Sequence, residues 1–480
     1  MTELLAPAGN WESLTAAVKA GCNSVYFGVK GLNMRANARN FELGELKKVC
    51  DFCHSNNVRC YLCVNTITYD EEFEKIRKIL DAAKEAKIDA IICWDMGVVN
   101  LVREYDAFEV HLSTQASVSN IEALKFYSKF VDRFILAREL SLEQIKQIKE
   151  KIIKESIKGP KGELIKIECF AHGAMCVAVS GRCFTSQFLY GRSANRGDCI
   201  QPCRRSFKVT DTEEPDKELE LDNNYVMSPK DLCTIEFIDK LIDAGIDALK
   251  IEGRSRSVDY VDVVVSSYRK AIDAVEKGGY TDEMKQKLKE RLKTVYNRKF
   301  SDGFYMGKPI NEWAGIYGSN SKATKEYVGV VRNYYPKIGV AEIKIEAKSL
   351  AKGDNIMITG NATGILKQSV EEMQKNHKDI EESNKGDIIA IKVKEKVRKN
   401  DKVFIIEASP ESKEEFKKDY GDWPLPKVKQ LWGLWKKDLS MQEIADEMGI
   451  PVRHVKYKLH KIHSNVLEKG EADIVKKRKK

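Results

Sequence analysis

The sequence predicts an α/β fold, a (β/α)8 TIM-like barrel followed by a small β-barrel and a C-terminal helix-turn-helix. Three observations predict it. Short apolar runs alternate with amphipathic stretches up to about residue 275, short strands separated by turns follow from about residue 327, and a helix-start signal stands at Ser440. We therefore expect the barrel with a cysteine-rich loop over residues 1–325, the β-barrel over 326–410, the helix-turn-helix unit over 427–465 and a basic tail over 466–480.

The first part of the chain carries eight apolar runs with the length of buried strands. Helical patterns lie between most of them, for example at residues 11–20, 73–86 and 142–152. Apolar strands that alternate with helices are typical of a parallel sheet covered by helices, and eight such units close a barrel. An open doubly wound sheet is the alternative, although no G-x-G-x-x-G follows the first strand. The expected strands are residues 3–6, 24–28, 60–64, 90–93, 109–112, 133–136, 166–169 and 248–251.

The next part is predicted to be a small β-barrel. Its expected strands are residues 327–331, 340–345, 355–358, 387–391 and 402–406. Short strands at this spacing are typical of small barrels. The sequences G-D-N-I-M-I-T-G and N-K-G-D-I-I-A-I resemble the second domain of translation GTPases, which cradles the acceptor end of tRNA, and this resemblance implies a tRNA partner.

The C-terminal part begins with a capping box in which Ser440 starts a helix and Glu443 reaches back to it. The helix should run to Met448, where Gly449 supplies a left-handed stop. A turn then leads to a second, basic helix, which is the spacing of a helix-turn-helix. This unit either binds nucleic acid or is a packing or dimerisation module. The basic residues on or near its second helix are Arg453, His454, Lys456, Lys458, His460 and Lys461.

Composition and charge narrow the class of protein. The chain has 480 residues, of which 42% are hydrophobic and 32% charged, so a sizeable core is possible. No apolar run approaches the roughly 18 residues of a spanning helix, and residues 1–9 lack the features of a signal peptide. We therefore expect a cytoplasmic protein with no membrane partner. The net charge of +9 is compatible with a nucleic-acid partner but does not require one.

A basic, glycine-rich stretch over residues 172–233 holds four cysteines, Cys176, Cys183, Cys199 and Cys233. Because no hydrophobic period separates them, we expect ligands presented on loops. Glycine lets the backbone fold closely around a bulky group, and arginine lowers thiol pKa and offsets negative charge. Buried free cysteines, which pack as small apolar residues, are the alternative. In a reducing compartment, disulfides are less expected than ligands or reactive thiols.

A second group of cysteines follows the pattern of a zinc ribbon, C-x-x-C and then C-x-x-C. Its members are Cys50, Cys53, Cys60 and Cys63. The first two fall on a predicted helix. The last two fall on a predicted strand at a spacing that points them to opposite faces. We therefore expect these four cysteines to be core residues and not metal ligands.

Polar residues follow most of the predicted barrel strands, where TIM-barrel active sites gather. We assign catalytic roles to four residues of these loops and of the cysteine stretch, and substrate binding to four others. His172 suits proton transfer because imidazole titrates near neutrality, and a structural histidine that braces the loop is the alternative. Arg192 and Arg196 suit carboxylates or phosphates. Hydrolase and phosphate-loop motifs are absent from the sequence. The catalytic candidates are His172, Arg192, Arg196 and Glu252, and the binding candidates are Gln115, Arg138, Glu139 and Arg254.

The sequence E-C-F-A-H-G-A-M-C-V-A-V-S-G-R-C from Glu168 resembles the signature of the collagenase-like peptidase family of unknown catalytic type. Also similar to that family are G-R-S-A-N-R-G-D-C-I-Q-P-C-R-R from Gly191, S-P-K-D-L-C from Ser228 and L-K-I-E-G-R-S-R-S-V-D-Y-V from Leu249. The resemblance covers roughly residues 1–330 and extends to the RNA-hydroxylase branch, which includes the tRNA wobble-uridine 5-hydroxylation proteins.

The resemblance implies a specific chemistry. Members of this branch convert the wobble uridine of tRNA to 5-hydroxyuridine, or modify a cytidine of ribosomal RNA, with prephenate as the source of the hydroxyl oxygen. Relatives bind a four-iron four-sulfur cluster through four cysteines, which match Cys176, Cys183, Cys199 and Cys233, whereas Cys203 falls at a variable position. Arginines of this chain suit the dicarboxylate prephenate. The candidates are Arg192 and Arg196, with Arg138 or Arg254 beside them.

The implied partners are tRNA and, by analogy with paired family members, a paralogous partner subunit. Two other functions stay open at this point. The first is a true peptidase acting on collagen-like or unfolded chains, as the family name states. The second is an iron–sulfur regulator that binds DNA through residues 440–463.

Overall fold

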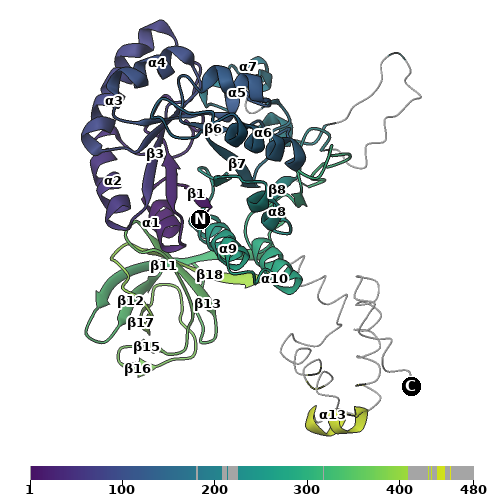
Figure 1. The fold of residues 1–480 in the computed structure, drawn as a ribbon. Coiled ribbons are helices and arrows are strands. Elements are labelled where there is room, and N and C mark those ends of the chain that lie inside the picture. Colours follow the sequence, from purple (N-terminus) through teal and green to yellow (C-terminus); the bar gives the residue numbers. More distant parts are fainter. Residues whose placement is uncertain are drawn as a thin grey trace. The chain divides into compact units, whose positions relative to one another are not determined.

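The computed structural model describes residues 2–179, 182–207, 213, 225–316, 318–408, 431, 434, 440–448 and 455. Eight parallel strands form a closed barrel, which confirms the predicted fold class (Figure 1). The barrel closes where β9 pairs in parallel with both β1 and β7. The strands are β1 (Glu3–Pro7), β2 (Ser24–Phe27), β3 (Arg59–Cys63), β4 (Ala90–Cys93), β5 (Glu109–Leu112), β6 (Arg133–Ile135), β7 (Lys166–Gly173) and β9 (Ala248–Ile251).

Amphipathic helices cover the outside of the barrel (Figure 1). Their starts follow local capping chemistry: Asn10 accepts a hydrogen bond from the Ser13 amide, and Ser141 and Gln144 form a capping box. The helices of this part are α1 (Trp11–Lys19), α2 (Leu46–Ser55), α3 (Phe73–Ala86), α4 (Met96–Tyr105), α5 (Ile121–Tyr127), α6 (Leu142–Lys154), α8 (Ile238–Asp243), α9 (Val258–Glu276) and α10 (Asp282–Leu292).

The regular alternation is interrupted after β7, where the chain makes a long excursion before α8 and β9. The excursion contains the short helix α7 (Thr185–Tyr190) and the strand β8 (Asp231–Cys233). β8 pairs antiparallel with the end of β7 and parallel with β10 (Phe300–Ser301). The predicted cysteine loop therefore starts at the carboxyl end of a barrel strand, the end at which TIM-barrel sites form.

The interior of the barrel holds a buried ionic network. Arg133 reaches Glu3 at 2.7 Å and Glu168 at 3.3 Å, and Lys250 reaches Glu168 at 2.7 Å. The Tyr61 hydroxyl donates to Glu3 at 2.7 Å. Because every carboxylate in this layer has a charged or hydroxyl partner, the desolvation cost of the charges is offset.

The second part of the unit is one antiparallel sheet of eight strands with its own apolar core. The five segments predicted as strands are all strands. Three more were missed, since β14 opens on a glycine and is partly polar, and β15 and β16 are very short. The strands are β11 (Ala323–Tyr335), β12 (Val340–Ile345), β13 (Asn355–Gly360), β14 (Gly364–Ser369), β15 (Met373–Lys375), β16 (Lys378–Asp379), β17 (Ile388–Lys392) and β18 (Lys402–Ala408).

This sheet packs against α1 and α9 of the barrel, and the two form one compact unit (Figure 1). Ala16 and Val258 on the helices bury against Met357 and Ile365 of the sheet. The Thr15 hydroxyl donates to the Asn361 carbonyl at 2.7 Å. An apolar contact with a partly buried hydrogen bond fixes the sheet beside the barrel.

The structure describes one helix of the C-terminal part, α13 (Met441–Met448), and it confirms the capping box. The Ser440 amide donates to Glu443 at 2.7 Å, and the Glu443 amide donates to the Ser440 hydroxyl at 3.2 Å. Apart from Val455, the predicted second helix and the tail over 466–480 lie outside the described residues, so most of the segment 440–463 on which the DNA-binding prediction rests is not described.

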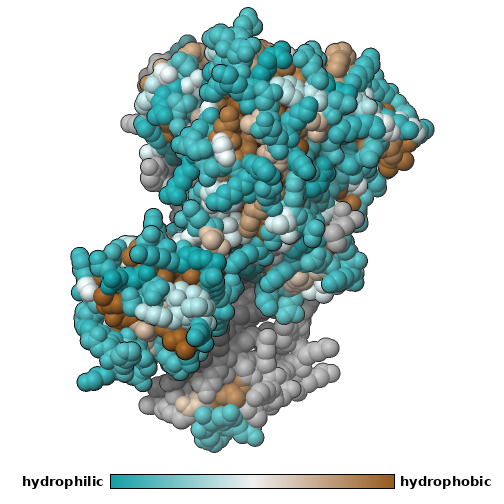
Figure 2. All heavy atoms as spheres, turned by 90° about the vertical axis from the view of Figure 1, so that its left-hand side faces the viewer, coloured by the Kyte–Doolittle hydropathy of each residue, from teal (hydrophilic) through white to brown (hydrophobic). Residues whose placement is uncertain are grey.

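The described helices include none that is both long and apolar enough to cross a bilayer. Figure 2 shows one face of the molecule, on which hydrophobic residues lie in separate groups among hydrophilic ones.

Candidate functional site

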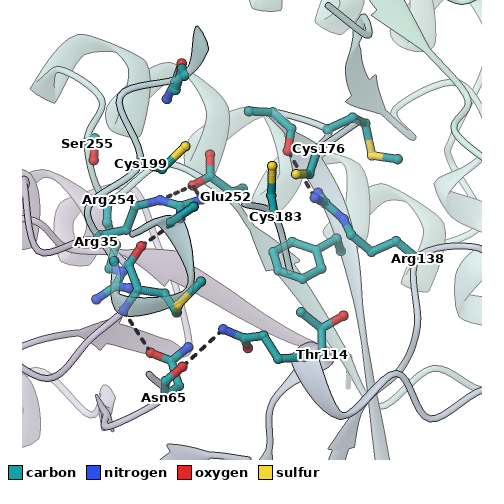
Figure 3. A pocket seen from close by; sticks show the side chains of 18 of the residues that line it. Arg35, Asn65, Thr114, Arg138, Cys176, Cys183, Cys199, Glu252, Arg254 and Ser255 are labelled. Carbon is teal, nitrogen blue, oxygen red and sulfur yellow. Dashed lines mark hydrogen bonds and ion pairs between the residues drawn. The ribbon is translucent and has the colours of Figure 1, made fainter. Parts of the chain in front are cut away.

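A cavity of about 210 Å³ lies where the carboxyl ends of the barrel strands meet the excursion after β7 (Figure 3). Its wall takes residues from the ends of several strands and from the cysteine stretch. Seven of the residues predicted from the sequence line it. They are Gln115, Arg138, Cys176, Cys183, Cys199, Glu252 and Arg254.

Five cysteines line this cavity: Cys63 at the end of β3, and four from the excursion after β7, Cys176, Cys183, Cys199 and Cys203. Burial raises the pKa of the Cys203 thiol, and negative charge on the other three cysteines of the excursion would raise it further, whereas Arg204 lowers it. Ser186 on α7 lies 3.8 Å from the Cys199 sulfur, and Thr185 lies 3.2 Å from the Cys183 sulfur. The excursion therefore brings four thiols to one space.

Cys233, the fourth cysteine of the predicted ligand set, is not among the residues that line this cavity. It lies buried on β8, opposite His172 of β7, and its sulfur is 3.9 Å from the Tyr268 hydroxyl of α9. Burial raises the pKa of this thiol to about 12. The antiparallel pairing of β8 with β7 holds Cys233 in the barrel wall, whereas Cys203 lines the cavity.

The donor set of the cavity fits the cluster that the family resemblance implies. A four-iron four-sulfur cluster takes four thiolates, and four thiols on loops line this space.

Three arginines of the cavity have no carboxylate partner among the described residues. Arg138 donates to the Ala174 carbonyl at 3.1 Å and lies over the Phe170 ring, while its Nε and Nη2 are buried with no hydrogen-bond partner there. Arg204 bonds the Ser228 hydroxyl and backbone carbonyls, and Arg254 bonds the Asn33 side chain at 3.0 Å.

Burial lowers the pKa of Arg138 and of Arg204, but a guanidinium stays charged at neutral pH. Buried N–H donors without acceptors are costly. The cavity is therefore suited to an anion that brings several acceptor oxygens.

Glu252 supplies negative charge to this cavity. Its carboxylate accepts from Arg35 Nη2 at 2.9 Å and from Nε at 3.3 Å (Figure 3). Burial alone would raise its pKa, but the guanidinium groups of Arg35 and Arg256 outweigh burial and lower the pKa to about 2. Glu252 is therefore ionised at neutral pH and acts as an acceptor, not as an acid.

Amide and hydroxyl groups form the wall nearest β3 and β5. Gln115 donates to the Asn65 carbonyl at 3.2 Å, Asn65 lies 3.5 Å from the Ser113 hydroxyl, and the Met34 amide donates to Asn65 at 3.2 Å (Figure 3). The amide and hydroxyl groups of this wall can form hydrogen bonds with the donors and acceptors of a planar polar ligand.

His172 lies outside the cavity, contrary to its predicted catalytic role. It is buried and packs against the rings of Tyr260, Tyr268 and Phe300. Burial lowers its pKa to about 3, so the imidazole is neutral at physiological pH. Its place behind β8 makes it a structural residue of the wall.

Arg192 and Arg196 also lie outside the cavity and hold the excursion in place. Arg192 pairs with Asp198 at 2.6 and 2.7 Å, and Arg196 pairs with Glu72 and donates to the Ile67 carbonyl at 2.9 Å. The fold brings these arginines to their acidic partners, and no local sequence pattern predicts the pairs. Glu139 is exposed and does not line the cavity.

A second, polar cavity of about 400 Å³ lies between the barrel and the second sheet. Arg254 and Ser255 line both cavities, so the two adjoin at these residues. The second cavity also takes backbone from the starts of α1 and α9. Its basic lining residues are Arg39, Arg254, Arg256, Lys325 and Lys402.

Comparison with known proteins gives the family. The profile of the family described as Peptidase family U32 matches residues 9–315. The chain belongs to this family. It is 48% identical over 403 residues to a collagenase of Porphyromonas gingivalis, covering 84% of this chain and 97% of the relative.

Two further relatives of this U32 protein carry different names. An uncharacterized protease of Methanocaldococcus jannaschii is 43% identical over 411 residues, covering 85% of this chain and 98% of the relative. The tRNA hydroxylation protein P1 of Bacillus subtilis is 36% identical over 364 residues, covering 75% of this chain and 83% of the relative. Both enzyme classes, peptidase and RNA hydroxylase, thus occur among the names of its relatives.

Proposed function

We propose that this U32 protein hydroxylates RNA, converting the wobble uridine of tRNA to 5-hydroxyuridine with prephenate as oxygen donor and a four-iron four-sulfur cluster as cofactor. The observation that carries the proposal is the cavity in which the four cysteines of the excursion stand beside three arginines that lack carboxylate partners among the described residues. The Bacillus subtilis relative named for tRNA hydroxylation supports the reaction class.

The cysteines of the cavity would hold the cluster through Cys176, Cys183, Cys199 and Cys203. When bound, the cluster supplies redox or Lewis-acid chemistry at the barrel mouth. The side chains of the cavity would bind and orient the substrates there.

Arg138 and Arg254 are the proposed ligands of the two carboxylates of the oxygen donor. Guanidinium groups bind carboxylates by paired hydrogen bonds, and the unpartnered Nε and Nη2 of Arg138 are two such donors on one edge. Ionised Glu252 fixes Arg35 and can accept a hydrogen bond from a hydroxyl group of the substrate.

The uridine would enter the cavity flipped out of its stack, because a stacked base is out of reach for chemistry. The second cavity, with its basic lining, suits the phosphates that flank the flipped nucleotide. On α7, beside the cysteines, Phe188 is 82% exposed and stacks on Phe184, which offers an adjacent base a stacking surface.

The peptidase reading is favoured by the name of the 48% identical relative. The geometry of the cavity argues against it. His172 is buried in the wall with a lowered pKa and Glu252 is ion-paired, so the described lining residues supply no serine or cysteine activated by a histidine.

The test is mass spectrometry of nucleosides from tRNA of the source organism with and without the gene. We expect 5-hydroxyuridine and its derivatives to disappear on deletion. Wild type and the Cys93→Ser control, a buried cysteine outside the cavity, should restore them, whereas Cys203→Ser should not. Restoration by Cys203→Ser, or a profile unchanged by deletion, would count against the proposal, and cleavage of collagen-like peptide by iron-free protein would favour the peptidase.

A further inference from the structure

A second group of metal-ligand side chains lies at the opposite, amino-terminal ends of the barrel strands. Cys50 and His54 are four residues apart on α2, so they share one helix face. Cys60 is the second residue of β3, and Asp89 directly precedes β4. Because Tyr61 is in register with Ala90, Cys60 and Asp89 lie side by side on neighbouring strands.

The ligand atoms of this group converge. The His54 Nε2 lies 3.0 Å from the Asp89 Oδ2, and the Cys60 Sγ lies 3.7 Å from that nitrogen and 3.4 Å from that oxygen. The Cys50 Sγ is 3.1 Å from the Cys60 Sγ. The imidazole, the Cys60 thiol and the carboxylate all lie within 4.8 Å of one another.

These separations can be compared with a tetrahedral zinc site. With bond lengths of about 2.3 Å to sulfur, 2.1 Å to nitrogen and 2.0 Å to oxygen, tetrahedral angles give about 3.3 Å for N–O, 3.5 Å for S–O, 3.6 Å for S–N and 3.8 Å for S–S. Three of the four observed distances agree within about 0.3 Å, and the two sulfurs are closer than a bound ion would leave them. One ion could be shared by the ligand atoms of His54, Cys60 and Asp89, whereas Cys50 is not within 4.8 Å of all three and would have to move closer to become a fourth ligand.

We propose that His54, Cys60 and Asp89 form a structural zinc site that joins α2 to the bases of β3 and β4, and that Cys50 moves toward the ion as its fourth ligand. Two thiolates, one imidazole and one carboxylate are a donor set that zinc accepts, and four protein ligands close its coordination shell. The two cysteines are fully buried, whereas His54 and Asp89 are partly exposed and leave a path for the ion.

The ligands of this proposed site differ from those of the zinc-ribbon pattern in the sequence. Cys63 stands at the other end of β3 and lines the large cavity, so it cannot join Cys60 at one ion. His54 and Asp89 take the places of Cys53 and Cys63. The sequence predicted that all four of these cysteines are core residues. Under the zinc proposal this prediction is kept for Cys53 and Cys63, whereas Cys50 and Cys60 become metal ligands.

The test uses full-length, fully reduced protein in a Cys176→Ser/Cys183→Ser/Cys199→Ser/Cys203→Ser background, which removes the excursion's thiols from the large cavity. Zinc is counted by elemental analysis after incubation with the metal and desalting, and Co²⁺ is added as a spectroscopic probe. We expect about one zinc per chain, with thiolate-to-cobalt charge transfer and tetrahedral ligand-field bands. His54→Gln and Cys60→Ser should each lower retained zinc at least about fivefold. Cys53→Ser, on the same helix, should retain it.

The His54→Gln variant keeps the test decisive if Cys60→Ser fails to fold, because its side chain is 38% exposed and its replacement leaves the core intact. Zinc retention at the parental level in His54→Gln would overturn the proposal. So would a reduced parent protein that binds neither zinc nor cobalt, in which case the four side chains form only a hydrogen-bonded cluster. Neither result depends on RNA hydroxylation.

Discussion

Arg138 is the residue whose environment bears most directly on substrate binding. Its replacement by Met removes a buried charge with two unpartnered N–H groups among the described residues, so we expect unchanged or higher thermal stability. The same change removes the proposed carboxylate ligand. A charge-assisted hydrogen bond is worth about 1.5–3 kcal/mol, so the KM for prephenate should rise about 10- to 100-fold.

The control for this prediction is Arg192→Met, which removes an exposed guanidinium already paired with Asp198. Its KM for prephenate should stay within about twofold of wild type, since the pair lies outside the cavity. Thermal melting and hydroxylation at varied prephenate concentration measure both effects. An Arg138→Met protein that melts lower and binds prephenate normally would show that Arg138 is structural.

The choice between Cys203 and Cys233 gives a second prediction at this scale. Protein purified without oxygen should carry about four irons per chain with the absorption of a four-iron four-sulfur cluster. Cys203→Ser should lose most of that iron, whereas Cys233→Ser should keep it and melt at a lower temperature, because its sulfur is buried against Tyr268. The reverse pattern of iron content would restore the sequence-based ligand set.

Residue patterns predicted part of the site. Cys176, Cys183 and Cys199 could be placed because glycine-rich, aperiodic sequence surrounds them, and Glu252 and Arg254 because they follow a predicted strand. The pairing of Arg196 with Glu72 joins segments 124 residues apart in the chain. No local sequence pattern distinguishes such a paired arginine from Arg138, which has no carboxylate partner among the described residues. The sequence therefore assigned Arg196 to the site, whereas the structure pairs it outside the cavity.

At the scale of elements, the buried ionic layer of the barrel is the feature most open to test. Glu168→Gln leaves Arg133 and Lys250 without their shared carboxylate, and breaking a buried pair costs about 3–5 kcal/mol. The control Glu163→Gln removes an exposed carboxylate paired with Lys166 and should change stability by less than about 0.5 kcal/mol. Urea unfolding measures the free energy of unfolding of both variants. Equally small changes in the two variants would mean that the ionic layer of the barrel is solvated.

The elements themselves were largely predictable. All eight barrel strands were found because parallel strands buried on both faces read as apolar runs, in spite of charged members such as Arg133. The excursion after β7 was expected as a loop. Its strand β8 was not, because three residues in a polar context carry no periodic signal, and this strand holds Cys233 in the barrel wall.

At the scale of the whole unit, the barrel and the second sheet together form a basic cavity beside the cysteine cavity. Lys402→Glu on the sheet should weaken tRNA binding and lower the slope of log affinity against log salt by about 1, because one phosphate contact is lost. The control Lys154→Glu changes an exposed lysine of α6 outside both cavities and should leave the slope unchanged. Equal effects would mean that the basic cavity has no special part in binding.

The central claim is that one cavity brings cysteines, an anionic oxygen donor and an RNA base together. The most direct measurement incubates purified, cluster-loaded protein with prephenate and tRNA lacking the modification, without oxygen gas, and follows the tRNA nucleosides by mass spectrometry. The account predicts that uridine gains the mass of one oxygen atom, only when prephenate is present, and that Arg138→Met slows this gain. Prephenate-independent turnover, or no gain on any RNA by protein that cleaves collagen-like peptide, would contradict it.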